Sequence, residues 1–112
     1  MTANMNEDVR KHLEQYPEEI RELYCTLREL VMEVCPGAEE RLWAKLPSYY
    51  AGERFVRLIP FKDHINIEAA AAVAHEDELK GCRFTPKGMA QAFAGRELPV
   101  ETLRQVFRET LL

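Results

Sequence analysis

Hydrophobic residues recur at helical spacing in the second quarter of the chain. Seven apolar side chains follow the i, i+3, i+4, i+7 pattern of a single helix face: Ile20, Leu23, Tyr24, Leu27, Leu30, Val31 and Val34. Such a stripe has to be buried against another element. Pro17 suits the first turn of this helix, and Pro36 followed by Gly37 ends it. The pattern therefore predicts a long amphipathic helix that packs on the core.

Shorter helices are predicted at both ends of the chain. Residues 6–16 favour a helix because Asn6 can cap it and acidic residues follow at its positive end. We expect residues 1–5, before this helix, to be disordered. Pro99 begins a last helix, whose apolar stripe comprises Val100, Leu103, Val106, Phe107 and Leu111.

The middle of the chain has the period of β-strands. Residues 41–45 predict a short strand around Trp43, and residues 46–48 predict a break after it. Residues 55–61 and 64–68 predict two strands joined by a tight connection. Because apolar and polar residues alternate, we expect an antiparallel meander with one wet face.

The remaining segments complete an α+β pattern. Residues 69–79 favour a helix, because four alanines come first and Lys80-Gly81 can close it. Residues 82–85 and 89–93 predict two more short strands around a turn. The whole predicts one α+β domain, residues 1–112, with a single-layer antiparallel sheet covered by N-terminal and C-terminal helices.

Composition and charge limit the class of protein and its possible partners. The chain has 112 residues, of which 46% are hydrophobic and 30% charged, as in an ordinary globular domain. The net charge is −4; residues 1–40 hold four Lys or Arg against ten Asp or Glu, a net −6, and the rest is net +2. An acidic first third repels phosphates, so we expect no nucleic-acid partner.

The cysteines and the hydropathy of the chain indicate its cellular compartment. The three cysteines are odd in number and form no CxxC pair, which argues against zinc fingers and disulfide frameworks. No apolar run approaches the roughly 18 residues of a membrane span, and the first residues lack an apolar signal core. We expect a cytoplasmic protein with reduced thiols, no membrane partner and no targeting segment.

Several segments match a family pattern: residues 35–40, 42–49, 61–65, 78–81, 85–88 and 97–99. Over about three quarters of its length the chain resembles the YdhG-like family of small bacterial domains of unknown function. Some members are described as frataxin-like iron chaperones. The resemblance implies a non-enzymatic binding protein with weakly bound iron as its cargo. The chain departs from the family after Glu68, where four alanines replace an aromatic residue and a proline-glycine break.

An acidic ridge is predicted on the back of the long helix. Glu18, Glu22, Glu29 and Glu33 fall within about 60° of one another, opposite the apolar stripe. Carboxylates in a row suit a hard cation such as iron, with water completing its shell. The alternative is a solvated helix face, whose charge Arg21 and Arg28 reduce by pairing.

A ligand pocket near Trp43 is a second hypothesis. Tyr49, Tyr50 and Phe61 would complete its apolar walls, and Lys45, Lys62, Arg83 and Lys87 would supply positive charge. The alternative places the aromatic rings in the core and the cations in solvent. His64 is either a ligand contact or pH-sensitive group, or a histidine that bonds within its own hairpin beside Asp63.

Three functions follow from these patterns. The first is a non-enzymatic binding protein with iron on the acidic ridge. The second is a protein-interaction module or homodimer that pairs through exposed sheet edges. The third is a small-molecule binder, for which the candidate residues are Trp43, Tyr49, Phe61, His64 and Lys87. No arrangement of the cysteines predicts catalysis.

Overall fold

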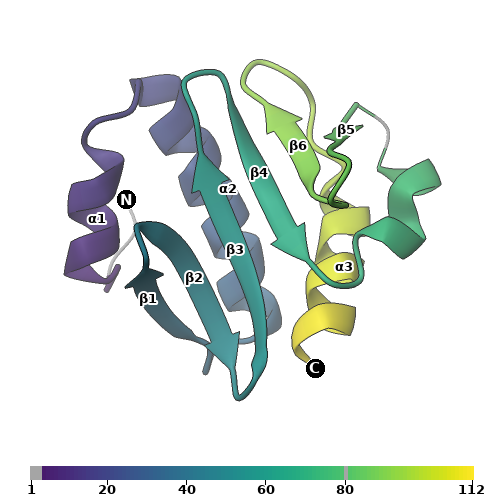
Figure 1. Ribbon diagram of the computed structural model, residues 1–112, viewed down its shortest axis with the longest axis horizontal. Helices are drawn as coiled ribbons and strands as arrows, with labels where there is room; N and C mark the ends of the chain where they lie inside the picture. Colours follow the sequence, from purple (N-terminus) through teal and green to yellow (C-terminus); the bar gives the residue numbers. More distant parts are fainter. Residues whose placement is uncertain (1–3, 80) are drawn as a thin grey trace.

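The computed structural model describes residues 4–79 and 81–112. Its helices are α1 (Glu7–Leu13), α2 (Glu18–Val34), the 3₁₀ helix η1 (Val73–Glu78) and α3 (Val100–Leu111). Its strands are β1 (Glu39–Trp43), β2 (Leu46–Ala51), β3 (Arg54–Pro60), β4 (His64–Ala69), β5 (Arg83–Phe84) and β6 (Ala90–Phe93). Figure 1 shows their arrangement.

The strands form one antiparallel sheet in the order β1-β2-β3-β4-β6-β5. The first four strands follow the chain, which confirms the predicted meander. The last hairpin attaches through β6, which pairs with β4. The α+β class and the antiparallel sheet with N-terminal and C-terminal helices are thus confirmed.

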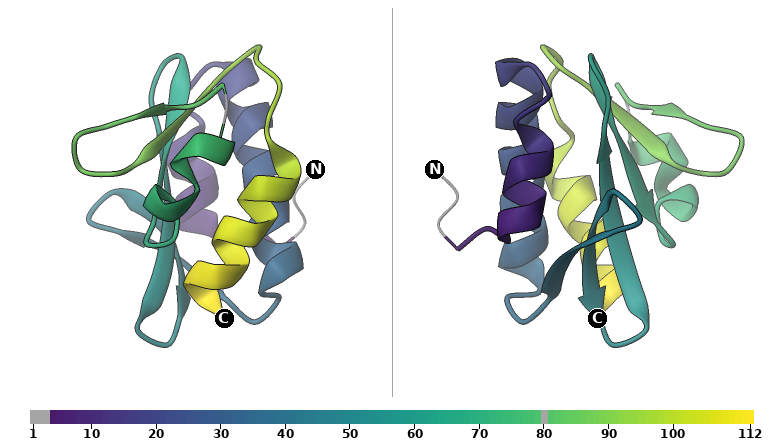
Figure 2. Two further views of the ribbon diagram at one scale, coloured as in Figure 1. Left: turned by 90° about the vertical axis from the view of Figure 1, so that its right-hand side faces the viewer. Right: turned by 60° about the vertical axis from the view of Figure 1, so that its left-hand side comes forward.

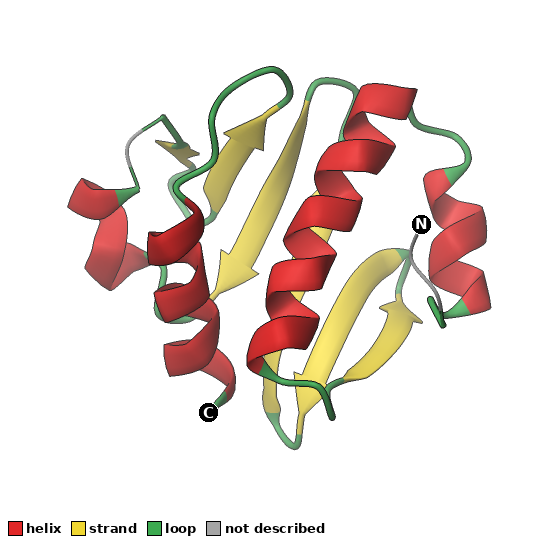
Figure 3. Ribbon diagram, turned by 180° about the vertical axis from the view of Figure 1, so that it is seen from behind, coloured by secondary structure: helices red, strands yellow, loops and turns green. Residues whose placement is uncertain are grey.

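The long helices cover one face of the sheet only. Figure 3, seen from behind, shows α2 and α3 lying across the strands, and α1 lies beside β1. In the edge-on views of Figure 2, these helices are on one side of the sheet and the turn between β5 and β6 projects toward the other. The core between the layers contains large buried side chains, including Tyr24, Leu27, Tyr49, Leu58, Ile65, Ile67, Leu103 and Phe107. We call the other side of the sheet the open face.

The amphipathic stripes account for the helices. Six of the seven stripe residues of α2 are buried, and Val34 is partly buried. In α3 all stripe residues after Val100 are buried. Asn6 caps α1 as predicted, since its side chain accepts hydrogen bonds from the Asp8 and Val9 amides. This helix ends at Leu13 rather than at Tyr16, because Pro17 disfavours helical conformation in the residue before it.

The predicted break at residues 46–48 is wrong, because these residues begin β2. A two-residue turn joins β1 to β2, with φ of 50° at Ala44 and 68° at Lys45. Such turns normally use Asn or Gly, since a left-handed conformation costs other residues about 1–2 kcal/mol each. The sequence carries no such signal. Pro47 is tolerated because the pairing of β2 with β3 begins only at Ser48.

The predicted helix over residues 69–79 is also wrong. Ala69 ends β4, and a short 3₁₀ helix follows from Val73. Ala69 and Ala72 are buried, so packing against the core overrides the helix propensity of alanine. The predicted closure at Lys80 lies outside the described residues. Residues 1–3 of the segment expected to be disordered also lie outside them, whereas Met5 packs against the core.

Candidate functional site

The open face carries an arginine between aromatic rings. Arg57 of β3 lies over the rings of Trp43, at 4.5 Å, and Phe55, at 4.0 Å. Its Nε donates to Ser48 Oγ at 3.0 Å, and its terminal nitrogens lie 3.4 Å from Glu68 and from the Tyr50 hydroxyl. Because all three guanidinium nitrogens have a partner and two rings lie against the group, Arg57 is a fixed part of the face.

His64 lies at the other end of this face. Its ring stacks on Phe61 with centroids 4.7 Å apart and a 10° interplanar angle, and Phe93 lies 5.1 Å away. Nδ1 is 2.7 Å from Asp63 Oδ1, and this hydrogen bond lowers the pKa of the aspartate. The contact with Asp63 is the one expected of a histidine that bonds within its own hairpin.

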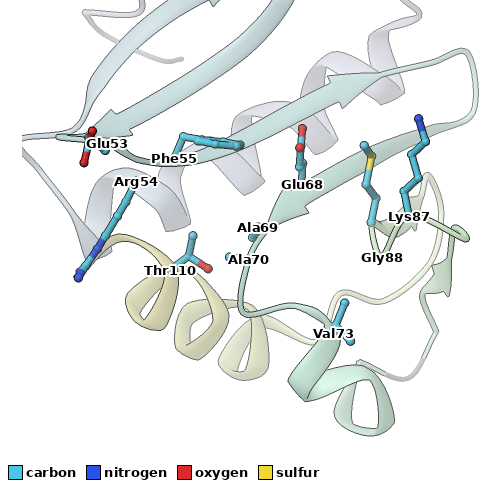
Figure 4. A pocket seen from close by; sticks show the side chains of 11 residues that line it. Glu53, Arg54, Phe55, Glu68, Ala69, Ala70, Val73, Lys87, Gly88 and Thr110 are labelled. Carbon is cyan, nitrogen blue, oxygen red and sulfur yellow. The ribbon is translucent and has the colours of Figure 1, made fainter.

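A cavity lies where β4 leaves the sheet (Figure 4). Its volume is about 440 Å3. It is bounded by the start of β3, the end of β4, η1, α3 and the turn between β5 and β6. The lining residues are Glu53, Arg54, Phe55, Glu68, Ala69, Ala70, Val73, Lys87, Gly88, Met89 and Thr110. Ligand pockets typically occupy roughly 300–1,000 Å3 and combine apolar walls with a few polar groups, so this cavity has the size and lining of a ligand site.

A glycine allows the cavity wall to close. Gly88 has a φ of 87°, and a Cβ added there would lie 2.8 Å from Val73 Cγ2. The backbone of the turn therefore lies directly against η1, an approach that only glycine permits. On the α3 side, the Thr110 hydroxyl accepts a hydrogen bond from the Ala71 amide at 3.1 Å, which fixes the floor.

Opposite charges line the cavity. Figure 4 shows the Glu68 and Lys87 side chains pointing in the same direction, away from α3. Glu68 is held only loosely, since its ion pair with Arg57 is 3.4 Å long and its side chain is 33% exposed. Lys87 makes no ion pair with any described residue. Arg54 is engaged differently, because its side chain donates to the Leu112 carbonyl at 2.7 Å.

The predicted pocket near Trp43 is not one site. Trp43 is 51% exposed, at the hairpin end of the open face. Tyr49 points into the core, because adjacent strand residues project to opposite faces. Its hydroxyl contacts the Tyr24 hydroxyl and donates a hydrogen bond to the Glu40 carboxylate. Phe61 and His64 do stack together, as described above, but Lys87 lies at the separate cavity.

The acidic ridge of α2 is exposed along its length. Glu33 pairs with Arg104 of α3 at 2.6 Å, whereas Arg28 is buried and does not reach the ridge. Within residues 4–79 and 81–112, no three His, Cys, Asp or Glu side chains gather so that they could hold a metal ion. Iron binding at Glu18, Glu22, Glu29 and Glu33 stays a prediction.

Several cavity residues were missed by the sequence reasoning. Phe55 and Glu68 could have been found, because alternation in the two predicted strands places both on the wet face. Val73 and Met89 could not, because their position depends on how η1 and the last hairpin meet the sheet.

The fold defines a small α+β domain with a six-stranded antiparallel sheet and one helix-covered face. A family model for a domain of unknown function, DUF5655, matches residues 9–94, and the chain belongs to this family. That match does not confirm the resemblance to the YdhG-like family or the frataxin-like link. No curated protein and no solved structure matches the chain. None of the described helices is both long and apolar enough to cross a membrane.

Proposed function

We propose that this protein is a non-enzymatic binding protein whose cavity beside β4 takes a small organic zwitterion, such as an α-amino acid with an apolar side chain. The observation that carries the proposal is the presence of Glu68 and Lys87, of opposite charge and not paired with one another, at one apolar cavity. An ammonium group would face Glu68 and a carboxylate would face Lys87. The apolar part would contact Phe55, Val73 and Met89.

The chemistry of the lining supports this ligand class over a simple anion or cation. A ligand with a single charge would satisfy one of the two side chains and leave the other partly desolvated, which costs free energy. A zwitterion compensates both charges at once. The apolar walls favour a ligand that also buries a hydrocarbon or thioether group.

Titration calorimetry with free amino acids tests the proposal. The panel comprises glycine, valine, leucine, methionine and phenylalanine, together with the N-acetyl and amide forms of each. We expect saturable binding of at least one apolar amino acid and none of its blocked forms. Glu68→Gln and Lys87→Gln should each weaken binding roughly tenfold to a hundredfold, because a hydrogen bond to a charged group contributes about 1.5–3 kcal/mol.

Two matched variants serve as controls. Glu29→Gln on α2 and Lys62→Gln after β3 remove the same charges away from the cavity, so both should bind as the unaltered chain does. Absence of binding across the panel, or binding that both cavity variants retain in full, would contradict the proposal.

A further inference from the structure

A second hollow lies at the opposite end of β3, and proline placement explains it. The pairing of β2 with β3 stops at Ser48 opposite Arg57, although both strands continue beyond this point. In β2, Pro47 precedes Ser48 and has no backbone N–H to donate to β3. In β3, the last residue, Pro60, has no backbone N–H either. The strands therefore separate. A groove of about 950 Å3 lies between these parts of β2 and β3 and α1, the helix beside β1 in Figure 1.

The floor of this groove is apolar and its rim is cationic. Leu42, Leu46 and Phe61 supply apolar surface, and Phe61 is 41% exposed. Lys11, Lys45 and Lys62 come from three separate parts of the chain: α1, the turn between β1 and β2, and the turn after β3. These are three of the five lysines in the sequence. Among the described residues that line the groove, Asp8 alone is acidic.

These lysines differ from five of the ten arginines in the chain, which are held in ion pairs. Arg10, Arg28, Arg41, Arg57 and Arg104 all form ion pairs with glutamates. Lys11, Lys45 and Lys62 form none with any described residue. In a chain of net charge −4, three such lysines thus lie around one apolar groove. Burial, and after it the nearby charge of Lys45, lower the pKa of His12, another groove residue.

We propose that this groove binds an acidic segment of a partner polypeptide, with an apolar anchor side chain seated on Leu42, Leu46 and Phe61. A small anion could reach one lysine, whereas three lysines from separate elements around a groove this wide match a chain with several carboxylates. Such charge complementarity selects the partner and steers its approach. The two prolines remove backbone donors from this part of the strands, so the segment is recognised by its side chains rather than by adding a strand.

Selection from a random twelve-residue peptide library on the immobilised full chain tests this inference. We expect the enriched peptides to carry Asp or Glu on both sides of a Leu, Phe or Trp. A fluorescent synthetic copy of the strongest peptide should bind in solution, more weakly as salt is raised. The triple variant Lys11→Gln, Lys45→Gln, Lys62→Gln should reduce its affinity at least tenfold, and circular dichroism should show an unchanged fold.

Lys87→Gln is the matched control, because this lysine lines the other cavity, and it should bind the peptide normally. Leu46→Ser tests the apolar floor and should weaken binding without changing its salt dependence. Enriched peptides with no excess of acidic residues would overturn the proposal, as would equal binding to the triple variant. Lysine-dependent binding of a polyanion such as heparin, without any peptide binding, would overturn the choice of partner. Neither result bears on the amino-acid cavity.

Discussion

Arg28 of α2 and Glu40 of β1 form a buried ion pair, with Arg28 Nε 2.6 Å from Glu40 Oε2 and both side chains less than 10% exposed. The backbone amide of Asn6 donates to the same carboxylate at 2.7 Å, and the Tyr49 hydroxyl donates to it at 2.8 Å. One carboxylate therefore joins α2, the strands β1 and β2, and the segment before α1. Burial alone would raise the pKa of Glu40, but these hydrogen bonds hold it below its ordinary value.

Removing the charge of Glu40 should destabilise the fold strongly. Glu40→Gln leaves Arg28 buried without its partner, which costs about 3–5 kcal/mol in comparable buried pairs. Urea unfolding measures the loss. Arg10→Gln breaks two ion pairs on the exposed face of α1 and should leave the urea midpoint nearly unchanged. A Glu40→Gln loss no larger than that of the control would contradict this role.

The hydroxyls of Tyr24 and Tyr49 are 2.6 Å apart in the core, and burial raises the pKa of both well above the ordinary value. Their contribution to stability is complete below the unfolded value of about 10 and is lost as pH rises from there toward the raised folded value, because the unfolded chain ionises first. We expect two of the four tyrosines to stay protonated until alkaline unfolding. Ultraviolet titration should show their ionisation coinciding with loss of helix signal by circular dichroism. In Tyr24→Phe, the absorbance change that accompanies unfolding should be half as large, because one buried tyrosine remains. Ionisation of Tyr24 and Tyr49 while the helix signal persists would contradict their burial in the core.

His75 joins η1 to α3, since its ring nitrogens lie 2.8 Å from Glu109 and 2.6 Å from Glu78. Hydrogen bonds to Glu109 and then to Glu78 raise the pKa of His75. A raised histidine pKa stabilises the fold below the unfolded value of about 6.5 and loses that contribution as pH rises through the folded value. The advantage of the unaltered chain over His75→Gln in melting temperature should therefore be larger near pH 6 than near pH 9.

His12 is the matched control for this pH dependence. Burial lowers the pKa of His12, so its contribution has the opposite sign and grows as pH rises. The advantage over His12→Gln should be smaller at the acidic end of the same range. Parallel curves for the two variants would contradict the stabilising role of the hydrogen bonds from His75 to Glu78 and Glu109.

Gly88 should tolerate no side chain. Gly88→Ala places a Cβ 2.8 Å from Val73 Cγ2 at a φ of 87°, so we expect a loss of about 1–3 kcal/mol from crowding and backbone strain. Adding Val73→Ala should recover the crowding part and leave the strain. Gly37→Ala is the control, because nothing lies within 4 Å of its added Cβ. Chemical unfolding of the four chains separates the two terms, and equal losses at Gly88 and Gly37 would refute the tight contact.

The sequence predicted α1, α2, α3 and most strands because their patterns are local. The stripe from Ile20 to Val34 and the alternation from Phe55 to Glu68 each require burial of one face, whatever the rest of the chain does. The turn at Ala44 and Lys45 could not be predicted, because its left-handed residues carry no local signal. The cavity could not be predicted either, because Val73, Lys87 and Thr110 come together only after three distant segments have packed.

The proposed site for a small zwitterion is the cavity between β4, η1 and the β5–β6 turn. Amide NMR spectra of the isotope-labelled chain, recorded during titration with methionine and separately with its N-acetyl form, test it most directly. We expect saturable shifts confined to the amides of Ala70, Val73, Gly88 and Met89, produced by the free amino acid alone and lost in Lys87→Gln. Shifts elsewhere, or no shifts with any free apolar amino acid, would contradict it.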